Sequence, residues 1–202
     1  EDFYPTFIQM LRADQQILEA MCADWEMVDV EGDDDSKFAK FNDILKHELF
    51  KKDRNPGQKL VIFSESKDTV EYLQRRLNRK DVLVIDSSNR TKLFKTIQEN
   101  FDANYKKSLR KDDYNIIITT DVLAEGVNLH RSNIIINYDT PWNSTKLMQR
   151  IGRVNRIGSE GKNIYNYVFY PSRQGNQIIK LNQIALSKIQ TFHTAVGEDN
   201  QI

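Results

Sequence analysis

The first fifty positions carry apolar residues at helical spacing. Apolar side chains recur every three or four positions over residues 3–24, which predicts a long amphipathic helix. The acidic stretch at residues 31–35 predicts a solvated loop, and Ser36 is then the expected N-cap of a second helix. The inner face of that second helix is formed by Phe38, Phe41, Ile44, Leu45 and Leu49. The turn-forming residues 55–57 end this helical region.

Beyond that break, short apolar runs alternate with stretches of helical periodicity. The apolar runs are residues 59–64, 82–85, 115–119, 133–137 and 164–170. Helical patterns occupy about residues 68–77, 91–101 and 174–194. Apolar strands that alternate with helices predict an α/β fold, in which helices cover both faces of a mostly parallel sheet. The last strand alternates and is aromatic, which favours a position at the sheet edge.

These patterns divide the chain into three segments. We expect residues 1–55 to form a helical extension and linker, residues 56–172 the α/β domain, and residues 173–202 a closing helix of that domain. A chain of 202 residues suits one such domain with an appendage.

Composition narrows the classes of partner. The 29 basic and 29 acidic residues give zero net charge, so any attraction to nucleic acid must come from a local patch. The single cysteine, Cys22, excludes an internal disulfide and fits a reducing compartment. The three histidines are far apart, so we expect no metal site. No apolar run reaches transmembrane length, and we expect a cytoplasmic protein without a membrane partner, nucleoid-associated if bacterial.

Polar residues follow four of the predicted strands. Ligands bind outside the carboxyl ends of the strands in open parallel sheets. Hydroxyl or carboxylate groups occur at each of these ends, at residues 64–66, 86–88, 119–121 and 139–141. Loops after strands are often polar for solvation alone, but four such loops on one rim indicate a binding edge.

The segment of residues 149–158 concentrates arginines. If residues 144–156 are helical, Leu147, Ile151 and Val154 share one apolar stripe, and Gln149, Arg153 and Arg156 lie nearly opposite. Arg150 lies off that outer face and fits a role in structure or nucleic-acid binding. From residue 143 to residue 162 there are five basic residues and one acidic residue, a local excess of four charges. A solvated helix face is the alternative interpretation.

Residues 118–129 form a second segment with phosphate-binding chemistry. Thr119 and Thr120 end a predicted buried strand, and threonine hydroxyls at a strand-to-helix junction can hold phosphate oxygens. Taken alone, Asp121 is most simply a helix N-cap and Gly126 a helix stop.

Two features of nucleotide hydrolases are missing from the sequence. There is no glycine-rich phosphate loop ending in Lys-Ser or Lys-Thr, and no acidic pair after an apolar strand for Mg²⁺. We therefore expect this chain by itself to be inactive toward ATP. Arginines without a phosphate cradle are typical of a lobe that donates charge stabilisers across a cleft.

These motifs together resemble the second, C-terminal RecA-like lobe of superfamily-two helicases and translocases, most closely the Swi/Snf-type branch. The resemblance covers about residues 36–171 and depends most on residues 118–129, 137–143 and 149–158. It implies a RecA-like three-layer α/β fold. It also implies an ATP-dependent helicase or translocase, whose first RecA-like lobe, in the same polypeptide, holds most of the ATP and Mg²⁺ contacts.

The resemblance also implies roles for individual residues. Arg153 and Arg156 match the catalytic arginine fingers, whereas Gly126, Asn128 and Gln149 match nucleotide-binding positions. The residues that match contacts to the nucleic-acid backbone are Ser64, Ser66, Thr119 and Thr120. The expected nucleic acid is double-stranded DNA.

Two departures from the DEAD-box type bear on the branch. Gln149 replaces the DEAD-box histidine and favours the Swi/Snf branch, and Asn128 stands where DEAD-box proteins carry an aspartate near the ribose. The open alternatives are a non-catalytic nucleic-acid-binding RecA-like module, an RNA helicase lobe, and a scaffold that docks through residues 3–24.

Overall fold

The computed structural model describes residues 3–27, 35–141 and 143–170. The chain forms two compact units, Glu1–Lys46 and His47–Ile202, which are described separately. The predicted closing helix at residues 174–194 lies outside the described residues. The domain bounds expected from the sequence stay a prediction.

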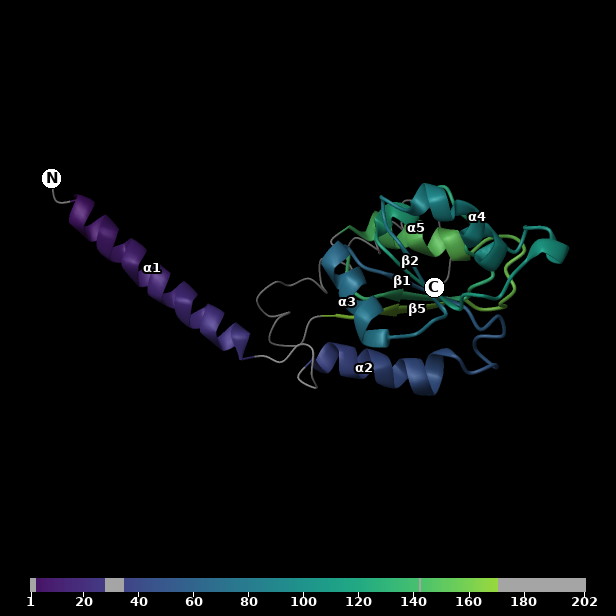
Figure 1. Ribbon diagram of the computed structural model, residues 1–202, viewed down its shortest axis with the longest axis horizontal. Coiled ribbons are helices and arrows are strands. Elements are labelled where there is room, and N and C mark those ends of the chain that lie inside the picture. Colours follow the sequence, from purple (N-terminus) through teal and green to yellow (C-terminus); the bar gives the residue numbers. More distant parts are fainter. Residues whose placement is uncertain (1–2, 28–34, 142, 171–202) are drawn as a thin grey trace, which may run out of the picture. The chain divides into compact units, whose positions relative to one another are not determined.

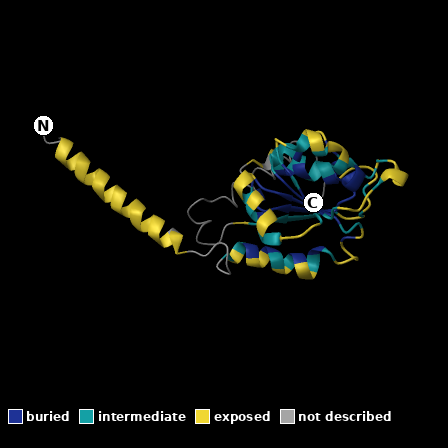
Figure 2. Cartoon of the chain, in the orientation of Figure 1, coloured by how far each residue is buried: buried dark blue, intermediate teal, exposed yellow. Residues whose placement is uncertain are grey.

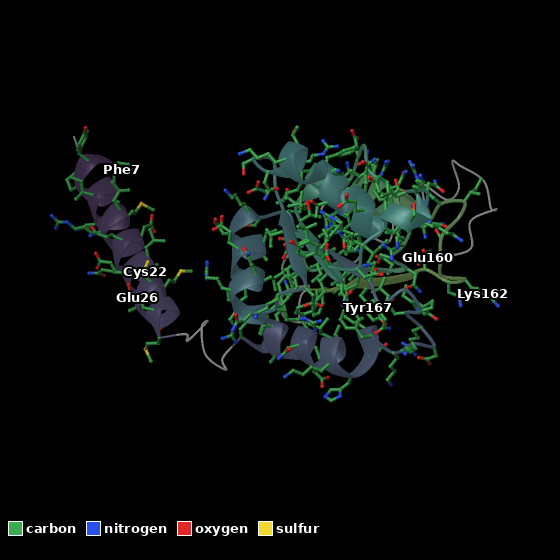
Figure 3. The ribbon with its side chains drawn as sticks, turned by 45° about the vertical axis from the view of Figure 1, so that its right-hand side comes forward. Phe7, Cys22, Glu26, Glu160, Lys162 and Tyr167 are labelled. Atoms are coloured by element: carbon green, nitrogen blue, oxygen red, sulfur yellow. The ribbon has the colours of Figure 1, made fainter. Side chains whose placement is uncertain are left out.

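The described part of the first unit contains two helices. The predicted amphipathic helix is α1 (Phe3–Glu26), and side chains such as Phe7 and Cys22 project from it into solvent (Figures 2 and 3). The second helix is α2 (Ser36–Ile44), and the π-helical turn that follows it, Leu45–Leu49, runs into the second unit at His47. The N-cap prediction was wrong by one residue. Asp35 caps α2, because its carboxylate accepts a 2.8 Å hydrogen bond from the Phe38 amide, and Ser36 is already the first helical residue.

A five-stranded parallel sheet forms the centre of the second unit (Figure 1). Its strands are β1 (Leu60–Phe63), β2 (Val82–Ile85), β3 (Ile116–Thr119), β4 (Ile134–Asn137) and β5 (Tyr165–Val168). The order across the sheet is β2-β3-β1-β4-β5, with all neighbours parallel. Buried apolar residues fill β1, β3 and β4, whereas β5 is half-buried and lies at the edge, as predicted. Tyr167 of this edge strand, labelled in Figure 3, donates a hydrogen bond of 2.8 Å to Glu48.

Helices cover both faces of this sheet, which confirms the predicted RecA-like α/β fold. The helices are α3 (Lys67–Leu77), α4 (Arg90–Phe101) and α5 (Ser144–Val154) (Figure 1). On one face, side chains of α4 and α5 join alternate residues of β1, β2, β3 and β4 in a single apolar core. On the other face, α3 packs against β2 and β3 through Val70 and Leu73. Burial of each large apolar side chain stabilises this arrangement by about 1.5–3 kcal/mol.

Parallel pairing brings the polar ends of four strands to one edge of the sheet. Ser64 follows β1, Asp86 follows β2, Thr120 follows β3, and Asp139 lies two residues beyond β4. The rim predicted from the sequence is therefore present. Among the residues that the structure describes, no helix is long and apolar enough to cross a membrane.

Candidate nucleotide and nucleic-acid site

The helix α5 has one face in the core and one face toward solvent. Leu147 and Val154 are buried and Ile151 packs against the core, which confirms the predicted apolar stripe. The predicted extent of the helix was wrong, because α5 ends at Val154 and Arg156 lies beyond it. The hydroxyl of Ser159 donates to the Val154 carbonyl at 2.8 Å and accepts from the Arg156 amide at 3.2 Å. This side chain satisfies backbone groups that another helical turn would have paired.

Arg150 is a structural residue on the inner side of α5. Its side chain is fully buried, and its guanidinium lies 5.1 Å from the centre of the Phe63 ring. It donates to Asp121 at 2.7 Å through Nε and to Asn137 at 2.9 Å through Nη1, and Nη2 lies 2.6 Å from Asp121. Asp121 is therefore an ion-pair partner and the first residue of a 3₁₀ turn (Asp121–Leu123), so its predicted role as an N-cap was wrong.

Arg153, one turn further along α5, has a different environment. Its Nε is buried and has no hydrogen-bond partner, and the guanidinium makes no ion pair with any residue that the structure describes. Burial, together with the positive charge of Arg156, lowers the pKa of Arg153, and Glu125 opposes this shift. A cation that has lost water without gaining a counterion is stabilised by any anion that reaches it.

The segment Glu125–Asn128 lies beside this guanidinium. Gln149 donates to the Glu125 carboxylate at 3.3 Å, and Arg156 donates to the Asn128 side-chain oxygen. Gly126 has a φ of +75°, a conformation that favours glycine. The structure thus brings together the five residues predicted around the nucleotide. Those residues are Gly126, Asn128, Gln149, Arg153 and Arg156.

The sequence did not reveal a further cation in this cluster. Arg90, the first residue of α4, donates to the Glu125 carbonyl at 2.8 Å. A Cβ atom on Gly126 would lie 2.6 Å from Nη2 of Arg90, so Gly126 leaves room for this guanidinium. The sequence contained no signal for it, because Arg90 and Gly126 are far apart along the chain.

The four predicted nucleic-acid residues gather at the ends of β1 and β3. Ser64 and Thr119 are fully buried. Ser64 donates to the Asp139 carboxylate, and Thr119 donates to the Thr120 carbonyl at 3.0 Å. Ser66 and Thr120 are partly exposed, and Ser66 also caps α3. Accessible hydroxyls at this edge therefore come from Ser66 and Thr120.

Lys146 connects this edge to α5. Its ammonium lies 2.9 Å from the Asp121 carboxylate and 3.0 Å from that of Glu65. Hydrogen bonds to Asp121 and then Glu65 raise its pKa. The loops after β1 and β3 are thereby linked to the helix that carries Arg153.

Within the described ranges, no three His, Cys, Asp or Glu side chains cluster in a way that could hold a metal ion. The orphaned guanidinium of Arg153 instead fits an anionic group such as a phosphate.

Comparison with known proteins identifies the family. Residues 36–158 match the helicase conserved C-terminal domain. The "uncharacterized ATP-dependent helicase YqhH" of Bacillus subtilis is 34% identical over 145 residues, which are 71% of this chain and 24% of that protein. The "ATP-dependent RNA helicase eIF4A" of Kluyveromyces lactis is 32% identical over 138 residues, which are 68% of this chain and 33% of that protein.

A solved structure supports the same fold. The C-terminal part of the Fun30 ATPase domain superposes with a TM-score of 0.56 at 22% identity, covering 74% of this chain and 44% of that one. The chain spans only about a quarter to a third of the curated relatives it matches. The match over residues 36–158 shows that the chain belongs to the helicase conserved C-terminal domain family, the second RecA-like lobe of superfamily-two helicases.

Proposed function

We propose that this chain is the second lobe of an ATP-dependent helicase or translocase and donates Arg153 and Arg156 to ATP held on a first lobe of the same polypeptide. The observation that carries this proposal is the guanidinium of Arg153, which is partly desolvated and has no ion-pair partner in the described structure. Arg156 adds a second positive charge nearby.

The proposed chemistry follows from this electrostatic state. Negative charge spreads over the transferred phosphoryl oxygens as the bond to the leaving phosphate breaks. A guanidinium without a counterion is available to that charge and needs no rearrangement of an existing ion pair. Arginine fingers of this kind contribute about 10³–10⁵ in turnover. In this proposal Mg²⁺ arrives with the ATP and is held by carboxylates of the first lobe.

Three further residues are proposed to contact the nucleotide. Gly126 is exposed and lacks a side chain, so its backbone allows close approach. Asn128 holds Arg156 through its side-chain oxygen, and Gln149 holds Glu125. Gln149 and Asn128 thus act largely by arranging charged neighbours around the nucleotide.

We propose that nucleic acid binds along the rim at the ends of β1 and β3. Ser66 and Thr120 would donate to backbone phosphates, while Ser64 and Thr119 shape their loops through internal hydrogen bonds. Such contacts are independent of base sequence. The Swi/Snf-like residue Gln149 favours double-stranded DNA as the substrate.

An RNA helicase lobe is the second candidate. The observation that favours it is the similarity to proteins named ATP-dependent RNA helicase eIF4A. A non-catalytic binding module is the third possibility, and it predicts that Arg153 affects binding alone.

The experiment is ATP hydrolysis by the protein that carries both lobes. Arg153→Ala and Arg156→Ala should each lower kcat by about 10³, with KM for ATP within about threefold of wild type. Arg75→Ala, at an exposed arginine of α3, is the matched control and should hydrolyse normally. Wild-type turnover in both site variants would refute the arginine-finger role.

The same assay shows whether DNA or RNA stimulates ATP hydrolysis. Double-stranded DNA should stimulate hydrolysis more than single-stranded RNA does. Stimulation by RNA alone would replace the proposed DNA translocase with the RNA helicase. This chain by itself should hydrolyse no ATP, since the phosphate loop is supplied by the first lobe.

A further inference from the structure

A buried carboxylate stands behind Arg156. Asp102 is the C-cap residue of α4 and is only 7% exposed. One of its oxygens accepts from the Asn104 amide at 2.8 Å, and the other accepts from the Asn128 side-chain nitrogen at 3.2 Å. The side-chain oxygen of Asn128 in turn accepts from Arg156. Three side chains that are distant in sequence thus form one hydrogen-bonded chain.

The donor-to-acceptor direction of this series of hydrogen bonds follows from the chemistry of Asn128, its middle residue. A side-chain amide has a donor end and an acceptor end, whereas an ionised carboxylate only accepts. Because Asp102 takes the donor end of Asn128, the acceptor end must face Arg156. The reverse orientation would point the amide oxygen at the Asp102 carboxylate, which only accepts, and the amide N–H groups at the Arg156 guanidinium, which only donates.

We propose that Asp102 is a positioning residue, which sets the orientation of Asn128 and thereby holds Arg156 for catalysis. This inference rests on the proposed role of Arg156 at the nucleotide. Arg156 lies beyond the end of α5 and is exposed, so the helix alone does not fix its guanidinium. Its other side-chain bond, from Nε to the Gly152 carbonyl, is long at 3.3 Å. The anchor through Asn128 and Asp102 supplies the missing restraint.

The most informative variant is Asp102→Asn, which preserves shape. The replacement keeps an oxygen for the Asn104 amide but turns a donor toward the donor end of Asn128. Asn128 must then rotate and present N–H groups to Arg156. We expect kcat in the two-lobed protein to fall about tenfold to a hundredfold, with KM for ATP changed less than threefold.

Exchanging the side chains of residues 102 and 128 should recover part of the lost kcat. Asn128→Asp alone places two carboxylates against each other and should also be slow. The double variant Asp102→Asn/Asn128→Asp restores a donor facing an acceptor at each step. Asn at position 102 then donates to Asp at position 128, and the second oxygen of that carboxylate accepts from Arg156. We expect its kcat to exceed that of either single variant, whereas a purely structural role predicts that the two losses accumulate.

A second measurement on this chain alone keeps the test independent of turnover. NMR should find rotation of the Arg156 guanidinium restricted in the wild type and in the exchange variant, and free in Asp102→Asn. Thermal unfolding of each variant within about 4 °C of wild type shows that the fold is retained.

The outcomes separate this inference from the proposed function. If Arg156→Ala is slow while Asp102→Asn is fast and its guanidinium stays restricted, the positioning role is wrong and the proposed function stands. If Arg156→Ala hydrolyses ATP at the wild-type rate, the proposed role of Arg156 is wrong, and the positioning role falls with it.

Discussion

Arg150 and Arg153 lie one turn apart on α5, yet their surroundings differ completely. Arg150 is fully buried, pairs with Asp121, binds Asn137 and stacks on Phe63. Arg153 is partly buried and has neither an ion pair nor a partner for its Nε in the described part of the chain. Pairing therefore distinguishes the two residues better than burial does. A paired buried cation holds the fold together, and a desolvated cation without a partner is available to a ligand.

Arg131 extends the comparison to the opposite ends of the strands. It is 8% exposed and lies just before β4. Its guanidinium donates to the carbonyls of Asn100 and Lys111 at 2.9 and 2.8 Å and to Asp112 at 2.7 Å, and it lies 3.6 Å from Glu160. Arg131 thus belongs with Arg150 among the structural cations. Of these three arginines, Arg153 alone makes no ion pair with the residues that the structure describes.

The largest expected loss of stability comes from replacing Arg150, whereas replacing Arg153 in the same helix should have little effect. Arg150→Met removes the buried partner of Asp121 and Asn137, leaves Asp121 with the half-exposed Lys146 alone, and should lower the free energy of unfolding by about 3 kcal/mol. Arg153→Met breaks no pair and should stay within about 0.5 kcal/mol of wild type. Urea unfolding of this chain measures both values. Equal losses in the two variants would show that pairing does not distinguish them.

His130 is also buried, but unlike the arginines it can lose its charge. It is fully buried, and burial lowers its pKa, with Arg156 and Arg110 acting in the same direction and Asp102 and Glu160 opposing. The unfolded chain binds the proton more readily, so stability is present above pH 6.5 and is lost as pH falls below it.

The measurement is urea unfolding at pH 7.5 and pH 5.5. Wild type should lose stability between these values, and His130→Gln should lose less. His47→Gln, at an exposed histidine, is the control and should keep the wild-type loss. The carboxylates whose pKa is lowered, Asp81, Asp86 and Asp112, act below about pH 4 and do not affect this window. An unchanged loss in His130→Gln would contradict the assignment.

A smaller effect than that of Arg150→Met should come from Lys146, the solvent-exposed residue that shares Asp121 with Arg150. Lys146 pairs with Asp121 and Glu65, but its side chain is 42% exposed and the pair is screened by water. Lys146→Ala should therefore cost less than about 1 kcal/mol in urea unfolding at low salt, and less still at high salt. A loss of stability as large as that of Arg150→Met would show that solvent exposure does not determine how much each ion pair contributes to the free energy of unfolding.

The local patterns along the chain predicted the elements well. All five strands lie inside the apolar runs, and the edge position of β5 followed from its alternation. These features depend on short-range periodicity and burial. The errors at helix ends have local causes, because Asp35 competes with Ser36 for the cap and Ser159 replaces the last predicted turn of α5.

The candidate site was predictable only in part. The resemblance to a known family pointed to Arg153, Arg156 and Asn128, and the structure brings them close to each other. Periodicity alone predicted that Arg150 lies off the outer face of the helix. Three contacts were not predicted, because each joins residues far apart in sequence. They are those of Arg150 with Asp121, of Arg90 with Glu125 and of Asp102 with Asn128. Such partners become visible only when the chain is folded.

The most direct test of the central claim is single-turnover ATP hydrolysis by Arg153→Ala in the protein that carries both lobes, with ATP and nucleic acid saturating. If Arg153 is unpaired in order to meet a phosphate, ATP should bind within about threefold of wild type and the chemical step should slow by about 10³. A chemical step within threefold of wild type would contradict the account.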